Sequence, residues 1–600
     1  MLQIKKLHSL PICLLLAASA VWAQSRANTA KNVTFVGTRM LTLGGHQGTL
    51  PPGFRFSAGL DVSVGFEIPG TSGTNRSARA PAAGVPRPAG NSISTGSFFG
   101  FSGLSQFDQA VAFTGATNGF NFELEPPDAG LAVGNGLVVE AINDAIAFFQ
   151  TNGNFLGYEA LNLLYNLPPA AIVDLNTGLV LSYGPFLSDP RVYYDSTNGF
   201  FITTVIEIDT DPATGNFAPG SHVLIAVIPK NLSTVNVFSL DVTNDGDANF
   251  GACPCLGDQP LIGADANGLY ISTNAFNIDQ RTFRGEQLYA ISLAALETGV
   301  PGNIPAVRFN NLSQAGEPAF SVQPATVPPG GSFETAQRGT EYLMSVLGNP
   351  LDNRLAVWAL TNTASLKTAA PSLTLVNTVI NTETYGNPPS TDQKSGPTPL
   401  RDYLASSQSA FGTFKNHLEL ITDNDDRLQQ VVFAAGKLWT SVPTIVKTQG
   451  PVRAGAAWFI LTPAVATGQV AASVFNQGYI AIDSPHQNSV MFPAVGVNAA
   501  GKAAISFSVV GVDLFPSAAY ATLDAVNGAG PIVISGAGVA PNDSASGYAP
   551  FGFRDARWGD YSAAVSDEAG NIWMGAQMIP VNPPVLLLAN WGTFITEVTP

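Results

Sequence analysis

The stretch Leu261-Ile-Gly-Ala-Asp-Ala-Asn-Gly-Leu-Tyr-Ile-Ser-Thr273 carries the pattern that decides the fold. A short apolar run is followed by an Asn-Gly turn and then by a second apolar run that contains an aromatic residue. Asn-Gly supplies the positive φ angles that a tight turn between two antiparallel strands requires. The pattern therefore predicts a β-hairpin of two short, buried strands.

The same pattern occurs seven times along the chain at nearly constant spacing. Successive turn glycines are 63, 69, 71, 97, 65 and 69 residues apart. Spacing this regular indicates a repeat architecture in which each unit buries its faces against its neighbours. The copies are LAVGNGLVVEA, VYYDSTNGFFITT, LIGADANGLYIST, TAQRGTEYLMSV, VVFAAGKLWTSV, AVGVNAAGKAAIS and AAVSDEAGNIWMG, with turn glycines Gly136, Gly199, Gly268, Gly339, Gly436, Gly501 and Gly570.

A third strand is predicted after every hairpin, in the runs IAFFQ, LIAVI, LYAISL, LAVWAL, WFILT, AYATL and FITEV. A fourth strand follows most of them, for example over Val235–Leu240. Four antiparallel strands in each unit of about 65 residues are typical of a β-propeller blade. We therefore predict an all-β protein that folds as a seven-bladed β-propeller. The alternative is a chain of β-sandwich domains, for which a single period of about 65 residues across the whole chain would be unusual.

The last of these third strands, Phe594–Val598, lies at the C-terminus. Its outer partner must therefore come from the other end of the chain, where it would close the ring and remove a free sheet edge. Residues Phe107–Phe113 are the best candidate for this N-terminal closing strand.

The first 23 residues have the features of a secretory signal peptide. Two lysines precede an apolar stretch, and Val21-Trp22-Ala23 forms a small-x-small cleavage site. We expect cleavage near Ala23 and a secreted or periplasmic protein; an uncleaved anchor is the alternative. Residues 24–118 are predicted to be an N-terminal segment and linker rich in Gly, Ser and Pro, and residues 119–600 to be the propeller. No later run is long and apolar enough to enter a membrane.

The composition narrows the class of partner. The chain has 600 residues, of which only 12% are charged, and a formal net charge of −16. An acidic surface repels phosphate backbones, so nucleic acid is not expected to bind. We expect a monomer whose partner is an extracellular glycan or protein.

The mature chain keeps two cysteines, Cys253 and Cys255. In an oxidising compartment they are expected to form a local disulfide, with metal binding as the alternative. Just before them, Asp245, Asp247 and Asn249 have the alternating oxygen ligands of a calcium loop, although the Glu at position 12 of an EF-hand is missing. A plain polar turn is the other interpretation. No other cofactor is predicted.

Polar side chains stand at the predicted starts of several innermost strands. In a propeller these positions gather at one mouth of the central channel, where carboxylates can act as general acid and base, bind a cation, or cap strand ends by accepting backbone N–H groups. The candidates are Asp128, Asp189, Asp258 with Gln259, Glu334, Arg427 with Gln429, and Asp560.

The largest insertion, residues 381–416, falls in the 97-residue interval. It contains Arg401, Asp402 and Tyr403, which suit recognition of a polar or sugar ligand. A solvated loop with local salt bridges is the alternative.

The seventh copy, Ser566-Asp567-Glu568-Ala569-Gly570-Asn571-Ile572-Trp573, resembles the Asp-box of sialidase-type propellers, with Glu568 where that motif has Asp. The resemblance implies a structural turn and supports the fold alone. The sialidase set of arginines, a Tyr–Glu pair and an acidic Asp cannot be placed on matching motifs. The chain also resembles secreted bacterial propeller proteins of uncharacterised activity, in the segments 125–128, 255–260, 396–402 and 558–562.

Motifs of other enzyme classes are missing from the sequence: there is no G-x-S-x-G, H-E-x-x-H or P-loop, and histidines are scarce. The first hypothesis is therefore a non-catalytic extracellular propeller that binds a glycan or protein partner. The second is a carboxylate-dependent glycan hydrolase or lyase with its site at the channel mouth. The third is a structural β module of a surface assembly.

Overall fold

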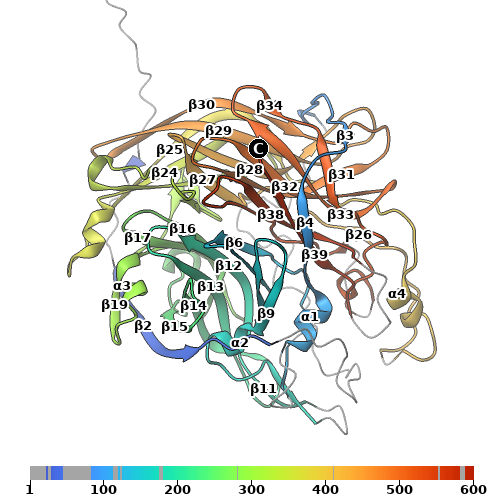
Figure 1. Ribbon diagram of the computed structural model, residues 1–600, viewed down its shortest axis with the longest axis horizontal. Helices are drawn as coiled ribbons and strands as arrows, with labels where there is room; N and C mark the ends of the chain where they lie inside the picture. Colours follow the sequence, from blue (N-terminus) through green and yellow to red (C-terminus); the bar gives the residue numbers. More distant parts are fainter. Residues whose placement is uncertain are drawn as a thin grey trace, which may run out of the picture.

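The computed structural model describes residues 22–23, 29–44, 83–112, 119–121, 124–174, 180–279, 282–409, 411–549, 551, 555–580 and 588–600. These residues form an all-β structure with a few short helices (Figure 1). The helices are α1 (Gln106–Val111), α2 (Leu161–Leu164), α3 (Leu293–Thr298) and α4 (Pro399–Leu404). No helix in this described part of the chain is long and apolar enough to cross a membrane.

Successive strands pair antiparallel in groups of four, which we number as units 1 to 7 and give from the innermost strand outward. Unit 1 consists of β6 (Gly130–Gly134), β7 (Leu137–Ile142), β8 (Ala145–Gln150) and β9 (Phe155–Ala160). Unit 2 consists of β12 (Phe186–Asp195), β13 (Phe200–Thr210), β14 (Phe217–Pro229) and β15 (Thr234–Asp241). Unit 3 consists of β16 (Cys255–Ala264), β17 (Gly268–Asn277), β18 (Phe283–Ser292) and β19 (Asn303–Phe309).

The second half of the chain continues the same pattern. Unit 4 consists of β22 (Gln323–Thr326), β23 (Thr340–Val346), β24 (Leu351–Thr361) and β25 (Thr374–Gly386). Unit 5 consists of β27 (Gln430–Ala434), β28 (Lys437–Val446), β29 (Arg453–Ala466) and β30 (Gln469–Ile480). Unit 6 consists of β31 (Asn488–Val497), β32 (Ala503–Gly511), β33 (Leu514–Asp524) and β35 (Ile532–Gly536). Unit 7 consists of β37 (Ala563–Ser566), β38 (Ile572–Met578), β39 (Gly592–Val598) and β4 (Phe99–Ser105).

The predicted third strands are confirmed in all seven units, because the quoted runs lie in β8, β14, β18, β24, β29, β33 and β39, except that Leu293, the last residue of LYAISL, begins α3. The predicted fourth strand over Val235–Leu240 lies in β15.

In unit 3 the predicted hairpin is present, since β16 and β17 pair antiparallel, but neither Asn267 nor Gly268 has the predicted positive φ angle, and the Asp265 carboxylate accepts both of their N–H groups instead. The predicted Asn-Gly geometry is found in unit 1, where Asn135 and Gly136 have φ angles of 51° and 76°. Two successive positive φ angles match the twist of the flanking strands.

The fourth copy of the repeat is not a hairpin, and this prediction was wrong. Residues Ala336–Arg338 form a 3-10 helix, and Gly339 only ends it. The innermost strand of unit 4 is instead β22, which lies well before that glycine. The glycine pattern alone could not distinguish a hairpin from a helical connection that leads into the same strand.

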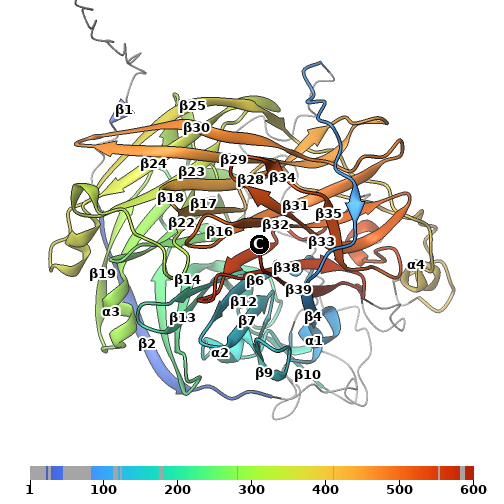
Figure 2. The ribbon, with the colours of Figure 1, turned by 45° about the horizontal axis from the view of Figure 1, so that its top comes forward.

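One cavity of about 90 Å³ lies among the innermost strands. Every unit contributes to its wall, through β6, β12, β16, β22, β27, β31 and β37. Figure 2 shows several of these strands around the centre of the molecule. The units are therefore arranged about a shared axis, as in a β-propeller.

The hydrophobic core lies between neighbouring units. One buried cluster joins Tyr342 and Val357 of unit 4 to Leu438 and Phe459 of unit 5. Another joins residues of units 2 and 3, among them Ile225 and Ile271. Since each unit buries its faces against the next, no unit has a complete core of its own.

The strand that pairs with β39 comes from the N-terminal part of the chain, but it is β4. The predicted Phe107–Phe113 strand is wrong, because α1 begins directly after Ser105. Ser105 and Asp108 form a capping box, in which each side chain is hydrogen-bonded to the other residue's backbone N–H. A capping box ends a strand and starts a helix. This signal is visible in the sequence as Ser105-Gln-Phe-Asp108.

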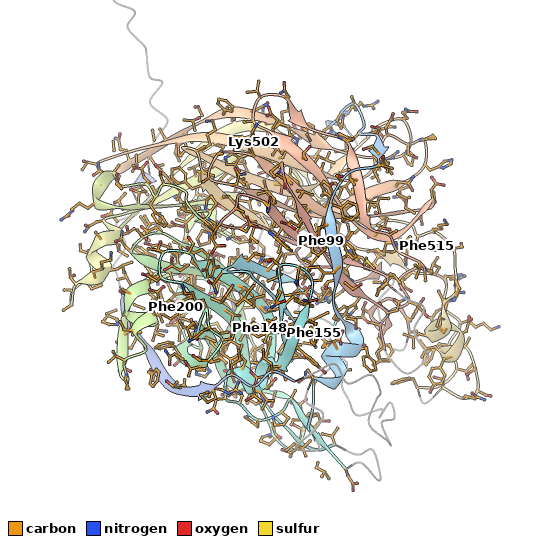
Figure 3. The ribbon with its side chains drawn as sticks, in the orientation of Figure 1. Phe99, Phe148, Phe155, Phe200, Lys502 and Phe515 are labelled. Carbon is orange, nitrogen blue, oxygen red and sulfur yellow. A yellow bond between two sulfur atoms is a disulfide. The ribbon has the colours of Figure 1, made fainter. Side chains whose placement is uncertain are left out.

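Aromatic rings attach β4 to unit 1. Phe99 contacts Phe101 with ring centroids 5.8 Å apart, and Phe101 contacts Phe149 at 5.1 Å. Phe149 in turn contacts Phe155 at 5.4 Å. Figure 3 labels Phe99 and Phe155, the two ends of this row. The outermost strand of unit 7 is thereby packed on the outer hairpin of unit 1.

Other N-terminal strands cover the outer edges of several units, which the sequence analysis did not predict. Strand β2 (Thr29–Met40) pairs with both β15 and β19 and so joins units 2 and 3 into one sheet. Strand β1 (Trp22–Ala23) pairs with β25, and β3 (Ile93–Ser94) pairs with β35. Covered edges cannot pair with other chains.

The remaining short strands connect or extend the units. They are β5 (Gly119–Phe120), β10 (Ala171–Val173), β11 (Val180–Tyr183), β20 (Ser313–Gln314), β21 (Glu317–Pro318), β26 (Leu420–Ile421), β34 (Gly528–Ala529) and β36 (Asp555–Ala556). The predicted signal segment, residues 1–23, lies outside the described residues except for β1.

Candidate functional site

A backbone bend precedes or interrupts the innermost strand of every unit. At this position the φ angle lies between 49° and 58°, although six of the seven residues are not glycine. Left-handed backbone at a non-glycine residue is costly and persists only where the surroundings hold it. The seven residues are Asp128, Asp189, Gln259, Ser321, Asn424, Phe492 and Gly559.

Side chains of the preceding unit hold several of these bends. The N–H of Asp189 donates to Asn143 Oδ1 at 2.9 Å, and the N–H of Gln259 donates to Asp189 Oδ2 at 3.1 Å. The N–H of Phe492 donates to Asp423 Oδ1 at 3.0 Å. These polar side chains therefore satisfy buried backbone donors and join neighbouring units.

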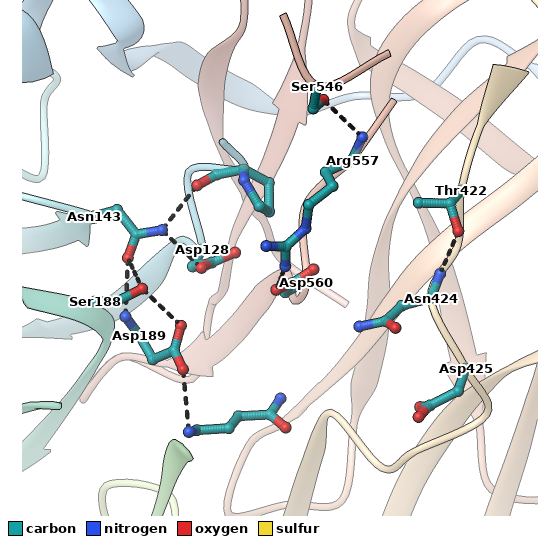
Figure 4. Close-up of polar contacts among 12 residues, drawn as sticks. Asp128, Asn143, Ser188, Asp189, Thr422, Asn424, Asp425, Ser546, Arg557 and Asp560 are labelled. Atoms are coloured by element: carbon teal, nitrogen blue, oxygen red, sulfur yellow. Dashed lines mark hydrogen bonds and ion pairs between the residues drawn. The ribbon is translucent and has the colours of Figure 1, made fainter. Parts of the chain in front are cut away.

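Four of the predicted site residues line one small pocket beside these bends, which we call the mouth pocket. They are Asp128, Asp189, Asp258 and Asp560. Figure 4 shows the carboxylates of Asp128, Asp189 and Asp560 together with the Arg557 guanidinium. The space inside the pocket is about 30 Å³, which is room for one or two water molecules.

Asp128 lies at the centre of this cluster and is 2% exposed. Burial raises the pKa of its carboxyl well above the usual range, and the negative charges of Asp560 and Asp189 raise this pKa further. The Arg557 charge and a 2.7 Å hydrogen bond from Asn143 Nδ2 to Oδ2 act in the opposite direction. Asp128 is thus held near other carboxylates in a way that favours its protonated form.

Two arginines accompany these acids. Arg557 forms an ion pair with Asp560, both side chains being largely buried. Arg191 places its guanidinium 3.3 Å from the ring centroid of Tyr561. Burial lowers the pKa of Arg191 and raises the pKa of Tyr561 well above the usual range. The tyrosine hydroxyl donates to the Pro190 carbonyl at 2.9 Å.

Gln259 and Arg427 extend this network to the next units. Arg427 Nη1 donates to Gln259 Oε1 at 2.7 Å, and its other nitrogens bind Asp425 at 2.7 and 2.9 Å. The Arg427 guanidinium also lies 5.1 Å from the Phe320 ring centroid. The predicted neighbour Gln429 lines the central cavity. The Arg427 guanidinium therefore links Gln259 of unit 3 to Asp425, which lies just before unit 5.

Glu334 does not belong to the mouth pocket, contrary to the prediction. Its carboxylate accepts the N–H of Ala336 at 2.8 Å and the Tyr342 hydroxyl at 3.4 Å. It stabilises the 3-10 turn that leads into β23, because β22 and not this segment supplies the innermost strand of unit 4.

Arg401, Asp402 and Tyr403 also lie apart from the mouth pocket. They belong to α4, which Figure 1 shows at the edge of the molecule. The Asp402 side chain is 76% exposed and lies 3.9 Å from Arg401. The start of α4 is fixed by Asp543, which accepts the N–H of Leu400 at 2.7 Å.

Cys253 and Cys255 form a disulfide. In the calcium loop predicted next to them, protein groups engage the side chains of Asp245 and Asp247. Asp245 is paired with Lys31 and Arg308 and accepts the Tyr289 hydroxyl at 2.8 Å. Asp247 accepts the Asn249 N–H at 2.9 Å. Lys31 and Arg308 thus neutralise Asp245, the first of the three predicted calcium ligands. Among the described residues, no group of three or more His, Cys, Asp and Glu side chains could hold a metal ion.

Several residues of the site were missed by the sequence analysis. Arg557 directly precedes the recognised segment 558–562, which contains Tyr561 but gave it no role, and Arg191 follows Asp189-Pro190 directly. Their proximity in sequence to predicted site residues was a usable signal. Asn143 gave no such signal, because it lies in the β7–β8 turn, and only the packing of unit 1 against unit 2 brings it to Asp189.

No protein-family model matches the chain. No curated protein matches it at significant similarity. Among solved structures, the Trypanosoma rangeli sialidase in complex with the inhibitor DANA aligns with 71% of this chain and 57% of its own length, at 8% identity and a TM-score of 0.30. This chain therefore spans little more than half of that sialidase.

Two other structures align over nearly their whole length. A protein of unknown function from Dyadobacter fermentans covers 69% of this chain and 95% of its own, at 10% identity and a TM-score of 0.30. The α-L-arabinofuranosidase of Podospora anserina in complex with cellotriose covers 57% and 91%, at 12% identity and a TM-score of 0.24. Similarities this low carry no argument about activity, so the function must come from the site's own geometry.

Proposed function

We propose that the chain is a secreted, non-catalytic, seven-bladed β-propeller that binds an extracellular glycan or protein partner at the rim of its mouth pocket. The seven units correspond to the blades, and β4 closes the ring by pairing with β39. Two observations support this arrangement: the central cavity has a wall strand from every unit, and the aromatic row from Phe99 to Phe155 fixes β4 against unit 1.

The observation that supports a binding function is that three carboxylates of the mouth pocket already have hydrogen-bond or ion-pair partners within the protein. Asp189 accepts a backbone N–H of the next unit, Asp560 is paired with Arg557, and Asp128 accepts from Asn143. Glycoside hydrolysis needs two carboxyl groups on either side of a sugar ring, with roughly 5–9.5 Å between them. A pocket of about 30 Å³ has no room for such a ring. A ligand that only rests on the rim does not need that room.

The chemistry of the rim suits a ligand rich in hydroxyl groups. Carboxylates accept hydrogen bonds from hydroxyls, and a guanidinium donates to their oxygens. Asp258, Asp560 and Arg557 supply both kinds of group within one pocket wall. A sugar chain meets both requirements, as does a polar loop of a protein partner.

One observation favours a second candidate, a carboxylate-dependent glycan hydrolase or lyase. The pKa of Asp128 is raised by burial and by the neighbouring charges of Asp560 and Asp189. A carboxyl whose pKa is raised above its usual range is what a general acid requires. This function would require the pocket to open around the substrate.

The deciding experiment measures retention and turnover of glycans by the mature chain that begins at Gln24. We expect retention without product, with binding weakened about tenfold or more in Asp560→Asn, since a charged hydrogen-bonding group is lost. Asp402→Asn changes an exposed carboxylate on α4 and should bind like the wild type.

Release of product by the wild type, abolished in Asp128→Asn, would overturn the non-catalytic proposal in favour of the hydrolase. Absence of any glycan retention would exclude the glycan and leave the protein partner, to be tested with the same Asp560→Asn and Asp402→Asn pair.

A further inference from the structure

The turn between β7 and β8 buries a carboxyl group that has no hydrogen-bond partner. Asp144 has a φ angle of 66°, is 0% exposed, and neither Oδ1 nor Oδ2 meets a donor. Burial raises the pKa of this carboxyl well above its usual range. A buried carboxyl without a partner is rare, because its desolvation is not compensated.

Two amide side chains lie close to the same turn and share this property. Asn121 Nδ2 donates to the Asp144 carbonyl at 3.2 Å and to the Gln109 carbonyl at 2.9 Å. The N–H of Leu161 donates to the Asp144 carbonyl at 2.9 Å, and Asn162 follows it in the chain. Asn121 and Asn162 are 2% and 0% exposed, and Oδ1 of each has no partner.

The orientation of both amides is fixed by their nitrogens. Asn162 Nδ2 donates to the carbonyls of Pro168 and Pro185, at 3.0 and 3.2 Å, and Asn121 Nδ2 also has two carbonyl acceptors. Exchanging oxygen and nitrogen in either amide would place the amide oxygen against two backbone carbonyl oxygens, which cannot donate a hydrogen bond to it. The unpartnered atoms are therefore oxygens, and they are hydrogen-bond acceptors that no protein donor serves.

We propose that Asp144, Asn121 and Asn162 bind a hard metal cation through their side-chain oxygens. Carboxylate and amide oxygens are the ligands that Na⁺ and Ca²⁺ share a preference for. A single carboxylate balances the charge of one Na⁺, whereas Ca²⁺ would leave one positive charge in the site. The three ligands come from the segment before unit 1, from its inner hairpin and from α2, so the ion ties these elements together.

This site is separate from the mouth pocket and from the Asp245 segment. Asp144 does not line the mouth pocket, and the oxygens of Asp245 are occupied by Lys31 and Arg308. The site also differs from the mouth pocket in having only one carboxylate.

The test is thermal unfolding of the mature protein after treatment with EDTA, at pH 8. The reference buffer contains N-methylglucamine chloride, which is replaced in one arm by NaCl at equal ionic strength and supplemented in the other with 1 mM CaCl₂. We expect one cation to raise the unfolding temperature by about 3 °C or more, with saturation. A response to Na⁺ alone identifies a monovalent site, and a response to Ca²⁺ a divalent one.

Asp144→Asn should lose this response, and Asp402→Asn should keep it. If Asp144→Asn does not fold, calorimetric titration of the wild type and of Asn121→Ala with the same two salts gives a readout independent of that variant. The proposal is wrong if neither cation binds or stabilises the wild type, or if Asp144→Asn retains the response. A cation-independent protein in which Asp144→Asn is as stable as the wild type would identify a buried, protonated carboxyl instead.

Discussion

Asp189 Oδ2 lies 3.1 Å from the backbone nitrogen of Gln259 and accepts its hydrogen bond across the boundary between units 2 and 3. The N–H of Asp189 is itself accepted by Asn143 of unit 1. The bends at Asp189 and Gln259 are thus linked across units 1, 2 and 3, and the Asp189 carboxylate contributes to the stability of the packed units.

Replacing Asp189 should therefore destabilise the protein. In Asp189→Ala the Gln259 N–H is left buried without an acceptor, and alanine must adopt a φ angle of 58°. We expect a loss of about 2–4 kcal/mol in the free energy of unfolding. Asp189→Asn keeps an acceptor oxygen and tolerates the left-handed backbone, so it should retain most of the stability. Denaturant unfolding measures both variants, and equal losses would contradict the role of this hydrogen bond.

Arg39 should hold β2 in place through its ion pair with Glu159. Arg39 Nη1 donates to Glu159 Oε2 at 2.7 Å, and Nη2 donates to Oε1 at 2.5 Å. The Glu159 side chain is 3% exposed. Arg39→Ala would leave a buried carboxylate unpaired and should cost about 3 kcal/mol at pH 8. The loss should be smaller at pH 5, where Glu159 can take up a proton. Met40→Ala, at an exposed position of the same strand, should leave unfolding unchanged at both pH values.

The protein should be less stable at pH 8 than at pH 5. Burial raises the pKa of Glu140 to about 7, although its Oε2 accepts the Leu104 N–H at 2.8 Å. Between about pH 4.5 and 7 the folded state then binds more protons than the unfolded state, so the free energy of unfolding falls as the pH rises. This one group accounts for about 3 kcal/mol of the fall.

The glutamine side chain in Glu140→Gln cannot ionise. This variant should therefore reduce the difference in the free energy of unfolding between pH 5 and pH 8 by up to about 3 kcal/mol. Asp402→Asn, at an exposed carboxylate, should leave the difference as it is. Thermal unfolding across this pH range measures the effect, and an unchanged pH dependence in Glu140→Gln would count against the assignment.

Phe101 should be needed to keep β4 in place. Its ring contacts both Phe99 and Phe149, so Phe101→Ala should cost about 2–3 kcal/mol from lost apolar burial and ring contacts. Amide exchange should become faster selectively in β4 and β39. Phe475→Ala removes a ring that is 46% exposed on β30 and serves as the control. Uniform exchange in both variants would show that β4 is held by backbone pairing alone.

The regular part of the fold could be predicted because it depends on local patterns. Short apolar runs bounded by turn residues, such as LYAISL, mark the strands, and Asn135-Gly136 sets its own turn geometry. Where a local signal was overlooked, the prediction failed: the capping box at Ser105 and Asp108 places a helix where a closing strand was expected. At Gly339 the prediction failed because one local signal has two meanings: a glycine can end a helix as well as form a hairpin turn.

The sequence by itself determined the all-β class, most of the hairpins, and the positions of Asp128, Asp189 and Asp560 near the starts of innermost strands. It could not tell which of these groups meet, because a contact such as that of Asn143 with Asp189 depends on how neighbouring units are rotated about the axis. Only the tertiary structure decided that Glu334 and Arg401 lie outside the mouth pocket. It also decided that Lys31 and Arg308 form ion pairs with Asp245, and that the Asp144 carboxyl is buried without a hydrogen-bond partner. Backbone preferences act over a few residues, whereas burial and charge pairing are set by segments that lie far apart in the chain.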